Sequence, residues 1–545
     1  IASLPLRLTH VLSDDSRERE IIDKKRLASI IKEVEKGLEA IGKSVNQSTA
    51  ETYLKIYNYL KRSSLHCVPA DANAPMNDVS LWQHLKLTAA FANCIWWDEG
   101  YRGDELENYS FALLSGDADK VSKYVRESTR LPDLSARSRR IDKATDTAAL
   151  SIEKNLGPEC LIFFGGGSIL ALCPHSEEIL QKVIVASERE FEKATQNQVR
   201  ITVNPKKVDG ATMQKSFGKV WETTVREMRL KKLDPPISAR PTVEKEAVVC
   251  DVCRVRKATK EDRRKVLPLN PPRPEGLCDI CGQLRDEGKG VWLDNIKKDT
   301  DFVGVIKADG DDMGKALCGD IFESIGKTVT PSRLSELSSL VHRTFEWDFK
   351  EIVRRHEGTE VFVGGDDLLA VFPGEKALCA ARELASEFAN KMAGVCTMSA
   401  GVAILNYKLP MYVGLEKADT LIRIAKEAGK DSAAFAVIGS TGITKSEMKK
   451  RAKPYRWSEL SVLLDLLDSL RGSEVASVQK RKIAELSQRS LELAEAYVKH
   501  LMGREVISWG EGEEYLSHLH SGVFSDAFLL FNAFKSRKKE EKEVA

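Results

Sequence analysis

The chain has 545 residues, a length that corresponds to roughly three to five domains. Its 83 basic and 81 acidic residues leave a net charge of +2, which neither requires nor excludes a nucleic-acid partner. No apolar run reaches the roughly 18 residues of a membrane span, and the charged residues within 1–20 argue against a secretory signal. The 11 cysteines form two close pairs and scattered singles, a pattern typical of a reducing cytoplasm with one metal site.

Both ends of the chain are predicted to be helical. In an N-terminal region over 1–107, apolar residues recur at helical spacing, and one helix is expected over 81–97. Residues 441–545 are expected to form a C-terminal helical domain with a solvated charged tail at 536–545. Packing on partner subunits or RNA and plain core packing explain the apolar stripe of this domain equally well. The stripe consists of Leu463, Leu464, Leu466, Leu467 and Leu470.

Residues 301–440 show the element order β-α-β-β-α-β-α. A strand over 302–309 is followed by a helix and then by two strands over 361–363 and 368–372. These two strands are joined by a Gly-Gly-Asp-Asp turn at 364–367, and a helix, a strand and a helix complete the unit. This is the ferredoxin-like arrangement that palm domains use.

Residues 108–235 repeat this order. A strand leads to Asp117, and two later strands flank a Gly-Gly-Gly-Ser turn at 165–168. The sequence Ile-Phe-Phe-Gly-Gly at 162–166 matches Val-Phe-Val-Gly-Gly at 361–365, but the first copy lacks both turn aspartates. We therefore predict an α+β multidomain chain with two ferredoxin-like palm units, the first degenerate and the second catalytic.

Three aspartates of the second copy are the candidate catalytic and metal-binding residues. Pairing of the hairpin beside the first strand would bring Asp309 close to Asp366 and Asp367. Carboxylates are the ligands that hard divalent cations prefer, and two such ions about 4 Å apart can activate a hydroxyl and stabilise a leaving pyrophosphate. Gly364 and Gly365 allow a tight turn that a phosphate or a base can approach. The pattern predicts an enzyme that joins nucleotides through their phosphates.

Other polar residues around this turn are ambiguous on sequence grounds. A Gly-Gly-Asp-Asp turn alone is more often an ordinary hairpin tip, and the position of Lys430 just past a helix end favours catalysis because it could neutralise a triphosphate. Asp311 and Asp312 could support the metal ligands or belong to a solvated loop. His84 has no partner at metal-ligand spacing, so we interpret it as an ordinary helix histidine.

A linker and insert at 236–300 separates the two copies and contains two Cys-x-x-Cys pairs. Cys250 and Cys253 form one pair, and Cys278 and Cys281 form the other. Four thiolates at this spacing are typical of a closed, structural zinc site. Basic residues between the pairs could contact RNA or could simply be solvated. They are Arg254, Arg256, Lys257, Lys260, Arg263, Arg264 and Lys265.

Several motifs together resemble a known family. The turn at 364–367, followed by Ser399–Ala403 and Ala425–Lys430, is similar to the GGDEF nucleotide cyclase pattern. Two such units, the first degenerate, with a four-cysteine insert between them, resemble the large (Cas ten) subunit of type III CRISPR effector complexes. Asp78–Ala90 is similar to the segment before the first palm of that family, and Leu114–Asp117 is similar to the entry of its first palm.

The resemblance implies a cytoplasmic enzyme of antiviral defence that converts ATP into cyclic oligoadenylate when its complex binds target RNA. It implies other effector subunits, guide RNA and target RNA as partners, and zinc and Mg²⁺ or Mn²⁺ as metals. By position, Asp309 and Asp366 would bind the divalent cation, with Asp367 assisting. Lys430 would hold phosphates and Ser399 would lie near the adenine.

Joining ATP molecules also requires a second nucleotide seat, and the backbone of Gly165 and Gly166 is the candidate for it. Family members often begin with an HD nuclease domain, whereas this sequence contains no His-Asp dipeptide, so single-stranded DNase activity is not expected. The ending Lys430-Asp431 resembles the Cmr subtype more than the Csm subtype.

Two other functions compete with this interpretation. One is a stand-alone GGDEF-type dinucleotide cyclase that acts as a homodimer, although Leu368 follows the aspartates where that family has Glu-Phe. The other is a non-catalytic scaffold for RNA and partner subunits. A scaffold has no need to gather mutually repelling carboxylates such as Asp366 and Asp367.

Overall fold

The computed structural model describes most of the chain, and the expectations for 1–20 and 536–545 concern segments outside the described residues. Within the described part, no helix has both the length and the apolar character needed to cross a membrane. The described residues are 24–43, 48–70, 79–98, 100–233, 248–267, 271–288, 293–298, 300–320, 322, 328–392, 394–439, 447–449 and 452–534.

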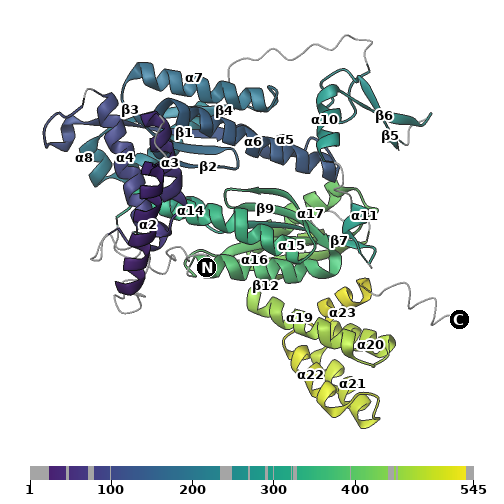
Figure 1. The fold of residues 1–545 in the computed structure, drawn as a ribbon. Coiled ribbons are helices and arrows are strands. Elements are labelled where there is room, and N and C mark those ends of the chain that lie inside the picture. The colour runs from purple at the N-terminus through teal and green to yellow at the C-terminus, as the bar shows by residue number, and fades with distance from the viewer. Residues whose placement is uncertain are drawn as a thin grey trace.

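The N-terminal region is helical, as predicted. It contains α2 (Lys24–Lys43), α3 (Thr49–Arg62) and α4 (Leu81–Trp97), drawn in purple in Figure 1. Helix α3 begins with a capping box in which the side chain of Ser48 accepts from the backbone of Glu51 and the Glu51 side chain accepts in return. His84 lies inside α4, where its backbone amide donates to the carbonyl of Ser80 in the ordinary helical pattern.

The first sheet has four strands in the order β2-β3-β1-β4, the arrangement that a ferredoxin-like chain order produces. Its strands are longer than predicted, and Asp117 lies within β1 rather than beyond it. The long helix between β1 and β2 begins at Leu131, with Pro132 in its first turn. The unit consists of β1 (Ser110–Ala118), α5 (Val121–Val125), α6 (Leu131–Leu156), β2 (Leu161–Gly165), β3 (Ser168–Pro174), α7 (Glu177–Ala194), β4 (Ile201–Asp209), α8 (Gly210–Lys215) and α9 (Phe217–Lys231).

The second sheet has six strands in the order β12-β11-β10-β7-β9-β8. Its four strands β10-β7-β9-β8 reproduce the order of the first sheet, and β11 and β12 extend the sheet beyond the prediction. The predicted long helix is interrupted by a π-helical segment at Thr344–Phe349. The unit consists of β7 (Phe302–Gly310), α12 (Met313–Cys318), α14 (Pro331–Arg343), α15 (Lys350–Arg355), β8 (Thr359–Gly364), β9 (Asp367–Pro373), α16 (Ala377–Lys391), β10 (Met398–Asn406), α17 (Met411–Glu427), β11 (Ser432–Ile438) and β12 (Pro454–Arg456).

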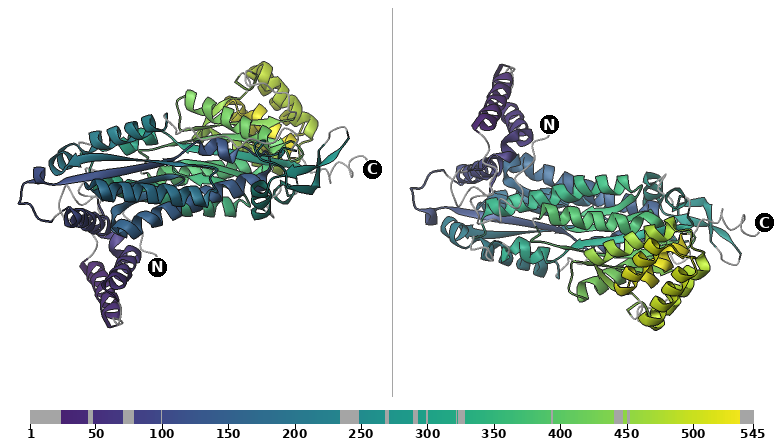
Figure 2. Two further views of the ribbon diagram at one scale, coloured as in Figure 1. Left: turned by 90° about the horizontal axis from the view of Figure 1, so that it is seen from above. Right: turned by 90° about the horizontal axis from the view of Figure 1, so that it is seen from below.

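The two sheets pack through reciprocal contacts, and they lie side by side along the molecule in Figures 1 and 2. Helix α6 of the first unit contacts β8 of the second, and α14 of the second contacts β2 of the first. The two hairpin turns meet at this junction. A Cβ added to Gly166 would lie 2.9 Å from Cα of Gly364 and 3.0 Å from the amide nitrogen of Gly365, so only glycine fits there without movement.

The insert and the C-terminal helices lie at the edges of this pair. The insert holds a hairpin of β5 (Lys260–Leu267) and β6 (Arg273–Leu277) followed by α10 (Asp279–Glu287). The apolar stripe of the C-terminal domain is core rather than an open docking face, because its five leucines are at most 4% exposed. The C-terminal helices are α19 (Trp457–Gly472), α20 (Ser477–Arg489), α21 (Leu491–Gly503), α22 (Trp509–His520) and α23 (Phe524–Ala533).

Candidate active site

Strand pairing brings the three predicted aspartates of the second unit to one end of its sheet. Asp309 on β7 is the direct cross-strand partner of Asp367 on β9. The backbone amide of Gly310 donates to the carbonyl of Asp366 at 3.0 Å, which ties the hairpin turn to the end of β7. Gly365 has a φ of 63°, the left-handed conformation that lets the two-residue turn close. The expected proximity of these residues is therefore observed.

The two turn carboxylates carry negative charge that the protein compensates only in part. Burial raises the pKa of Asp366 to about 6, with a further contribution from neighbouring Asp367. Burial also raises the pKa of Asp367, while Lys307 and Arg126 oppose that rise and Asp419 adds to it. Oxygen donors whose ionised forms lack full compensation fit a divalent cation, because such an ion would supply the missing charge.

Asp309 contacts a basic residue for which the sequence analysis predicted no role. Its carboxylate contacts Lys426 on α17, whose pKa is lowered first by burial and then by Lys307 and Lys430. Lys426 lies in the segment 425–430 that resembles the cyclase pattern. Its position four residues before Lys430 could have identified it from the sequence. Lys307 was detectable as well, because it lies two residues before Asp309 and therefore on the same face of β7.

The carboxylates of Asp309, Asp366 and Asp367 do not converge as tightly as a formed metal site. In the described residues, the only group of three or more possible metal ligands whose donor atoms all lie within 4.8 Å is the four-cysteine cluster. The contact of Asp309 with Lys426 occupies one of the three carboxylates. A cation at this site would therefore replace Lys426 as the partner of Asp309.

Ser399 on β10 lies directly opposite Asp309 on β7, and its expected position near the adenine stays a prediction. Its side chain is fully buried, and its hydroxyl donates to Oδ1 of Asp311 at 2.7 Å. Asp311 is itself buried and also accepts from Oγ1 of Thr397 at 2.8 Å and from the amide of Asp431 at 3.0 Å. Asp311 therefore does not belong to a solvated loop, and whether it supports the metal ligands stays a prediction.

Lys430 and Asp312 form an ion pair beside this centre. Their Nζ and Oδ2 atoms are 2.5 Å apart, and both residues adopt left-handed backbone conformations, with φ of 64° and 55°. The Lys430 side chain is 37% exposed, so its ammonium group remains accessible to an anion. Asp312 belongs to the solvated part of the loop, and the pair lowers its pKa.

The equivalent position in the first unit is neutralised. Asp117 pairs with Ser168 across the strands, in the register that Asp309 and Asp367 occupy in the second sheet. The Ser168 hydroxyl donates to Asp117 at 3.1 Å, and Lys232, just beyond α9, contacts the same carboxylate. Asp119 shares Lys232 at 3.6 Å and lies 3.7 Å from Arg200, so two basic side chains balance the two carboxylates of this position.

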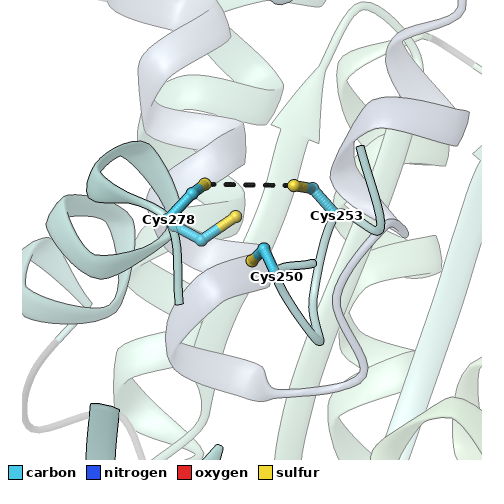
Figure 3. A group of neighbouring side chains, drawn as sticks. Cys250, Cys253 and Cys278 are labelled. Carbon is cyan, nitrogen blue, oxygen red and sulfur yellow. Dashed lines mark hydrogen bonds between the residues drawn. The ribbon is translucent and has the colours of Figure 1, made fainter. Parts of the chain in front are cut away.

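The four cysteines of the insert form a second candidate site (Figure 3). All four are buried, and their sulfur atoms lie within 4.8 Å of one another. Hydrogen bonding among the four thiols lowers the pKa of Cys253 and Cys278 and raises that of Cys250 and Cys281, as expected for sulfurs that share protons at close range. The donor set fits one soft metal ion in a closed tetrahedral site, as expected from the paired spacing.

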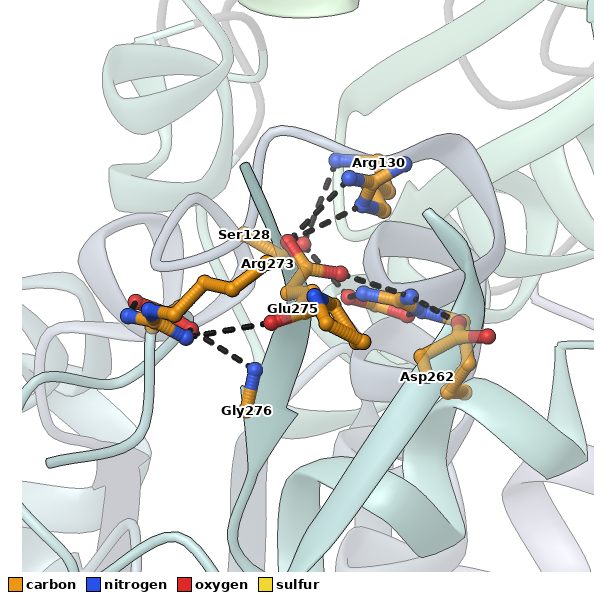
Figure 4. Close-up of polar contacts among 10 residues, drawn as sticks. Ser128, Arg130, Asp262, Arg273, Glu275 and Gly276 are labelled. Atoms are coloured by element: carbon orange, nitrogen blue, oxygen red, sulfur yellow. Dashed lines mark hydrogen bonds and ion pairs between the residues drawn. The ribbon is translucent and has the colours of Figure 1, made fainter. Parts of the chain in front are cut away.

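The insert is fixed to the first unit by a buried charge network (Figure 4). Arg285 is 1% exposed and donates to Asp133 on α6, to Asp262 and to Glu275.

Of the basic residues between the cysteine pairs, Arg254, Lys257, Lys260 and Arg263 are exposed, Arg256 is half-buried, and the side chains of Arg264 and Lys265 lie outside the described part.

Comparison with known proteins agrees with this geometry. Residues 302–434 match the family model of the Cas10/Cmr2 second palm domain. The chain is 30% identical to the CRISPR system subunit Cmr2 of Pyrococcus furiosus over 164 residues, which cover 26% of this chain and only 19% of that protein. It is 22% identical to the Cas10/Csm1 single-strand-specific deoxyribonuclease of Enterococcus italicus over 83% of this chain and 73% of that protein.

Solved structures share the fold. The chain superposes on Csm1 of T. onnurineus with a TM-score of 0.65 and 14% identity, covering 93% of this chain and 80% of that one. A Csm1–Csm4 cassette in complex with cA4 gives a TM-score of 0.63 with the same identity and coverage. The palm match, the Cmr2 and Csm1 relatives and this shared fold together show that the chain resembles the Cas10 large subunits of type III CRISPR complexes.

Proposed function

We propose that this chain synthesises cyclic oligoadenylate from ATP as the large subunit of an RNA-guided effector complex in antiviral defence. The observation that carries the proposal is the cross-strand pairing of Asp309 with Asp367 beside the partly compensated carboxylate of Asp366. Structural neighbours in which Csm1–Csm4 cassettes hold cA3, cA4, pppApA, AMPPNP or ATP support a nucleotide substrate.

The aspartates have distinct proposed roles. Asp309 and Asp366 would hold Mg²⁺ or Mn²⁺, and Asp367 would assist from its position opposite Asp309. When bound, such ions activate an attacking hydroxyl and neutralise the leaving pyrophosphate. The chain itself contributes position and charge: Gly364 and Gly365 let the phosphates approach the backbone of the turn, and Lys430 attracts them.

Release of Lys426 from Asp309 is part of this proposal. When a cation takes its place on Asp309, the ammonium group of Lys426 becomes available to the phosphates of a nucleotide. Lys430 lies four residues further along, so both lysines would serve the same triphosphate. Substitution of Lys426 should therefore weaken ATP binding, and substitution of Lys430 should do the same.

The first unit is proposed to be a degenerate palm that holds the second nucleotide. Its Gly165–Ser168 turn lies against the Gly364–Gly365 turn, which supports two seats on either side of the junction. The backbone of Gly166 packs directly on Gly364 and is therefore covered at this junction. Gly165 is the better candidate for contact with the nucleotide.

We further propose that the four cysteines bind one zinc ion with a structural role. All four ligand positions would be filled by sulfur, so no open position would remain for a substrate. Elemental analysis of the purified protein should find about one zinc per chain, and Cys278→Ser should remove it and lower the thermal stability. Cys379→Ser is the control, since Cys379 lies outside the cluster; zinc-free wild-type protein would contradict the proposal.

Partners are proposed from the relatives. Csm1 structures occur in cassettes with Csm4, so a neighbouring effector subunit is expected here, with guide RNA and target RNA in the assembled complex. Free buried thiols such as Cys94, Cys160 and Cys173 suit a reducing cytoplasm. The deoxyribonuclease activity named for the Csm1 relatives is not part of the proposal, because the sequence contains no His-Asp dipeptide.

Product analysis tests the function directly. The complex would be incubated with ATP or GTP and Mg²⁺ or Mn²⁺, with and without target RNA, and the products identified by mass spectrometry. We expect cyclic oligoadenylate only with ATP and target RNA. A cyclic dinucleotide made by the isolated chain would instead support the stand-alone cyclase, and no product under any condition would support the scaffold.

A further inference from the structure

Arg126 is a residue of the first unit whose side chain reaches the aspartate site of the second unit. It follows α5, and its guanidinium makes two contacts with the carboxylate of Asp419 on α17, one of them 2.8 Å from Nη2 to Oδ1. The side chains are 33% and 18% exposed, so the pair is sheltered. Two parallel contacts of this kind match the planar fork of a guanidinium to a carboxylate and fix its orientation.

Asp419 also contacts a second basic side chain, that of Lys307, which lies at the active site. Nζ of Lys307 lies 3.3 Å from Oδ1 of Asp419, and Lys307 is on the same face of β7 as Asp309. Lys307, Arg126 and Asp419 all act electrostatically on Asp367. Arg126 therefore balances part of the charge of Asp419, which weakens the attraction of Asp419 for Lys307 and lets Lys307 also act on Asp367.

The segment that carries Arg126 is held by a fully buried arginine on α6. Nη1 of Arg137 donates to the carbonyl of Tyr124 at 3.1 Å and to Glu127 at 2.7 Å. Its guanidinium also lies 4.7 Å from the centre of the Tyr124 ring. These contacts fix the residues on both sides of Arg126, whose side chain then has few ways to leave Asp419.

Arg137 is in turn in contact with the four-cysteine cluster. Its Nη2 donates to Sγ of Cys281 at 3.6 Å. Arg285 anchors the insert to the same helix, with contacts of 2.5 and 2.8 Å to Asp133. The contacts thus run without a break from the cluster through Arg137 and the 124–127 segment to Arg126 and Asp419.

We propose that Arg126 is a positioning residue that strengthens the binding of nucleotide phosphates at the aspartate site, and that the four-cysteine insert holds it there through Arg137. The inference rests on the proposed function and deepens it, because it gives the insert a part in nucleotide affinity. The physical basis is charge: without Arg126, Asp419 would compete for Lys307 and repel the phosphates.

The first test is the affinity of the full-length chain for ATP with Mg²⁺, measured by calorimetry. Arg126→Gln removes the charge and should weaken binding by roughly fivefold, as expected for one charge lost near the phosphates in a partly solvated site. Arg126→Lys keeps the charge and should stay within about twofold of wild type. In the activated complex, the same loss should raise KM and leave kcat nearly unchanged. Unchanged affinity in Arg126→Gln would overturn the proposal.

The second test addresses the connection to the insert. Arg137→Met should speed hydrogen exchange of the amides in 121–127 and weaken ATP binding as Arg126→Gln does, while the metal content of the cluster stays at the wild-type level. The double variant should bind ATP no more weakly than either single variant, because both changes break one connection. Arg139→Met is the matched control: Arg139 is exposed on the same helix and contacts the insert at the carbonyl of Glu287.

The outcomes separate this inference from the proposed function. If Arg137→Met leaves exchange in 121–127 unchanged, or if the two substitutions weaken ATP binding multiplicatively, the connection through the insert is wrong. If the wild-type complex binds ATP and makes no oligoadenylate, the proposed function fails, while the affinity and exchange results still decide the role of Arg126.

Discussion

The two hairpins of this chain share their geometry and differ in their charge. In each, the strands show an irregular register at the same place, before Phe163 in the first and before Phe362 in the second. In each unit, an aspartate on the first strand of the sheet unit, β1 or β7, lies opposite the last residue of the four-residue turn. That residue is Ser168 in one unit and Asp367 in the other. The comparison teaches that the fold provides the same hairpin twice, and that only the second hairpin carries an excess of carboxylates, to which we assign the proposed activity.

Lysines complete the contrast between the two seats. Asp117 has Lys232 and a hydroxyl as partners. Asp119 shares Lys232 and also faces Arg200, so the negative charge at this position is balanced. Asp309 has Lys426, but Asp366 and Asp367 add two more carboxyl groups whose pKa values are raised by burial. An excess of buried carboxylates costs stability, and such excess is typical of a site that awaits a cation.

The largest expected effect comes from removing that excess. Asp366→Asn should reduce oligoadenylate synthesis by at least ~100-fold, corresponding to about 3 kcal/mol of lost electrostatic stabilisation. Asp117→Asn changes the aspartate of the first unit, at the register position of Asp309, and should cost little. Synthesis by the assembled, RNA-activated complex would be measured for both. If Asp117→Asn abolishes synthesis and Asp366→Asn does not, the reactive seat has been assigned to the wrong unit.

The difference between the two turns was readable from the sequence because it lies in local motifs. The Gly-Gly-Asp-Asp turn, the strand ending near Asp309 and the paired cysteines all depend on short spacings, and the element order of both units followed from periodicity. What could not be read were partners brought together by tertiary packing. Arg126 and Asp419 lie 293 positions apart, and nothing around Arg126 marks it as part of a site.

Burial was the other property hidden from the sequence. Ser399 lies in a strand whose neighbours give no sign that its hydroxyl donates to Asp311, so this contact could not be predicted. Lengths of elements were also underestimated, since polar residues such as Asp117 extend β1 where the apolar pattern stops. Tertiary packing supports strand pairing beyond the apolar run, and only the structure shows how far.

The second prediction concerns the contact between the turns. Gly166→Leu would force a side chain into the backbone of Gly364 and strain a residue with φ of 57°. Separation of the hairpins should lower synthesis by roughly tenfold, equivalent to about 1.4 kcal/mol of lost alignment. Gly503→Leu is the control, because a Cβ there meets nothing within 4 Å. Full activity of Gly166→Leu would show that the two seats work without close contact.

The third prediction concerns the stability of the packing between the units. Asp142 on α6 faces Glu346 and Lys350 of the second unit, and burial raises its pKa to about 7. A carboxyl with a raised pKa holds its proton more tightly in the folded state, so its contribution to stability is lost as the pH rises from about 4 to 7. Asp142→Asn should therefore be more stable than wild type at pH 8, by roughly 1 to 2 kcal/mol, and equal to it near pH 4.

Glu357 offers a control of opposite sign for this experiment. Lys298 and Lys376 lower its pKa to about 2, so Glu357→Gln should lower stability at pH 8 and have no effect below that value. Thermal unfolding across pH would be compared for both variants. Equal pH dependence in Asp142→Asn and wild type would show that Asp142 is solvated at the junction.

The smallest expected effect is the most specific to the comparison. Ser168→Ala removes one hydrogen bond of 3.1 Å to Asp117 and leaves Lys232 on the same carboxylate, so the charge of the first seat does not change. A single hydrogen bond of this kind contributes about 1 kcal/mol at most to local order, and synthesis should stay within roughly twofold of wild type. Asp367→Ala, at the same register position of the second hairpin, should instead fall close to Asp366→Asn. Rates for both variants in the activated complex measure what the position contributes in each unit. A large loss in Ser168→Ala would mean that the first seat takes part in the chemistry through Asp117, and that its hydroxyl, rather than the lysine, sets the state of that carboxylate.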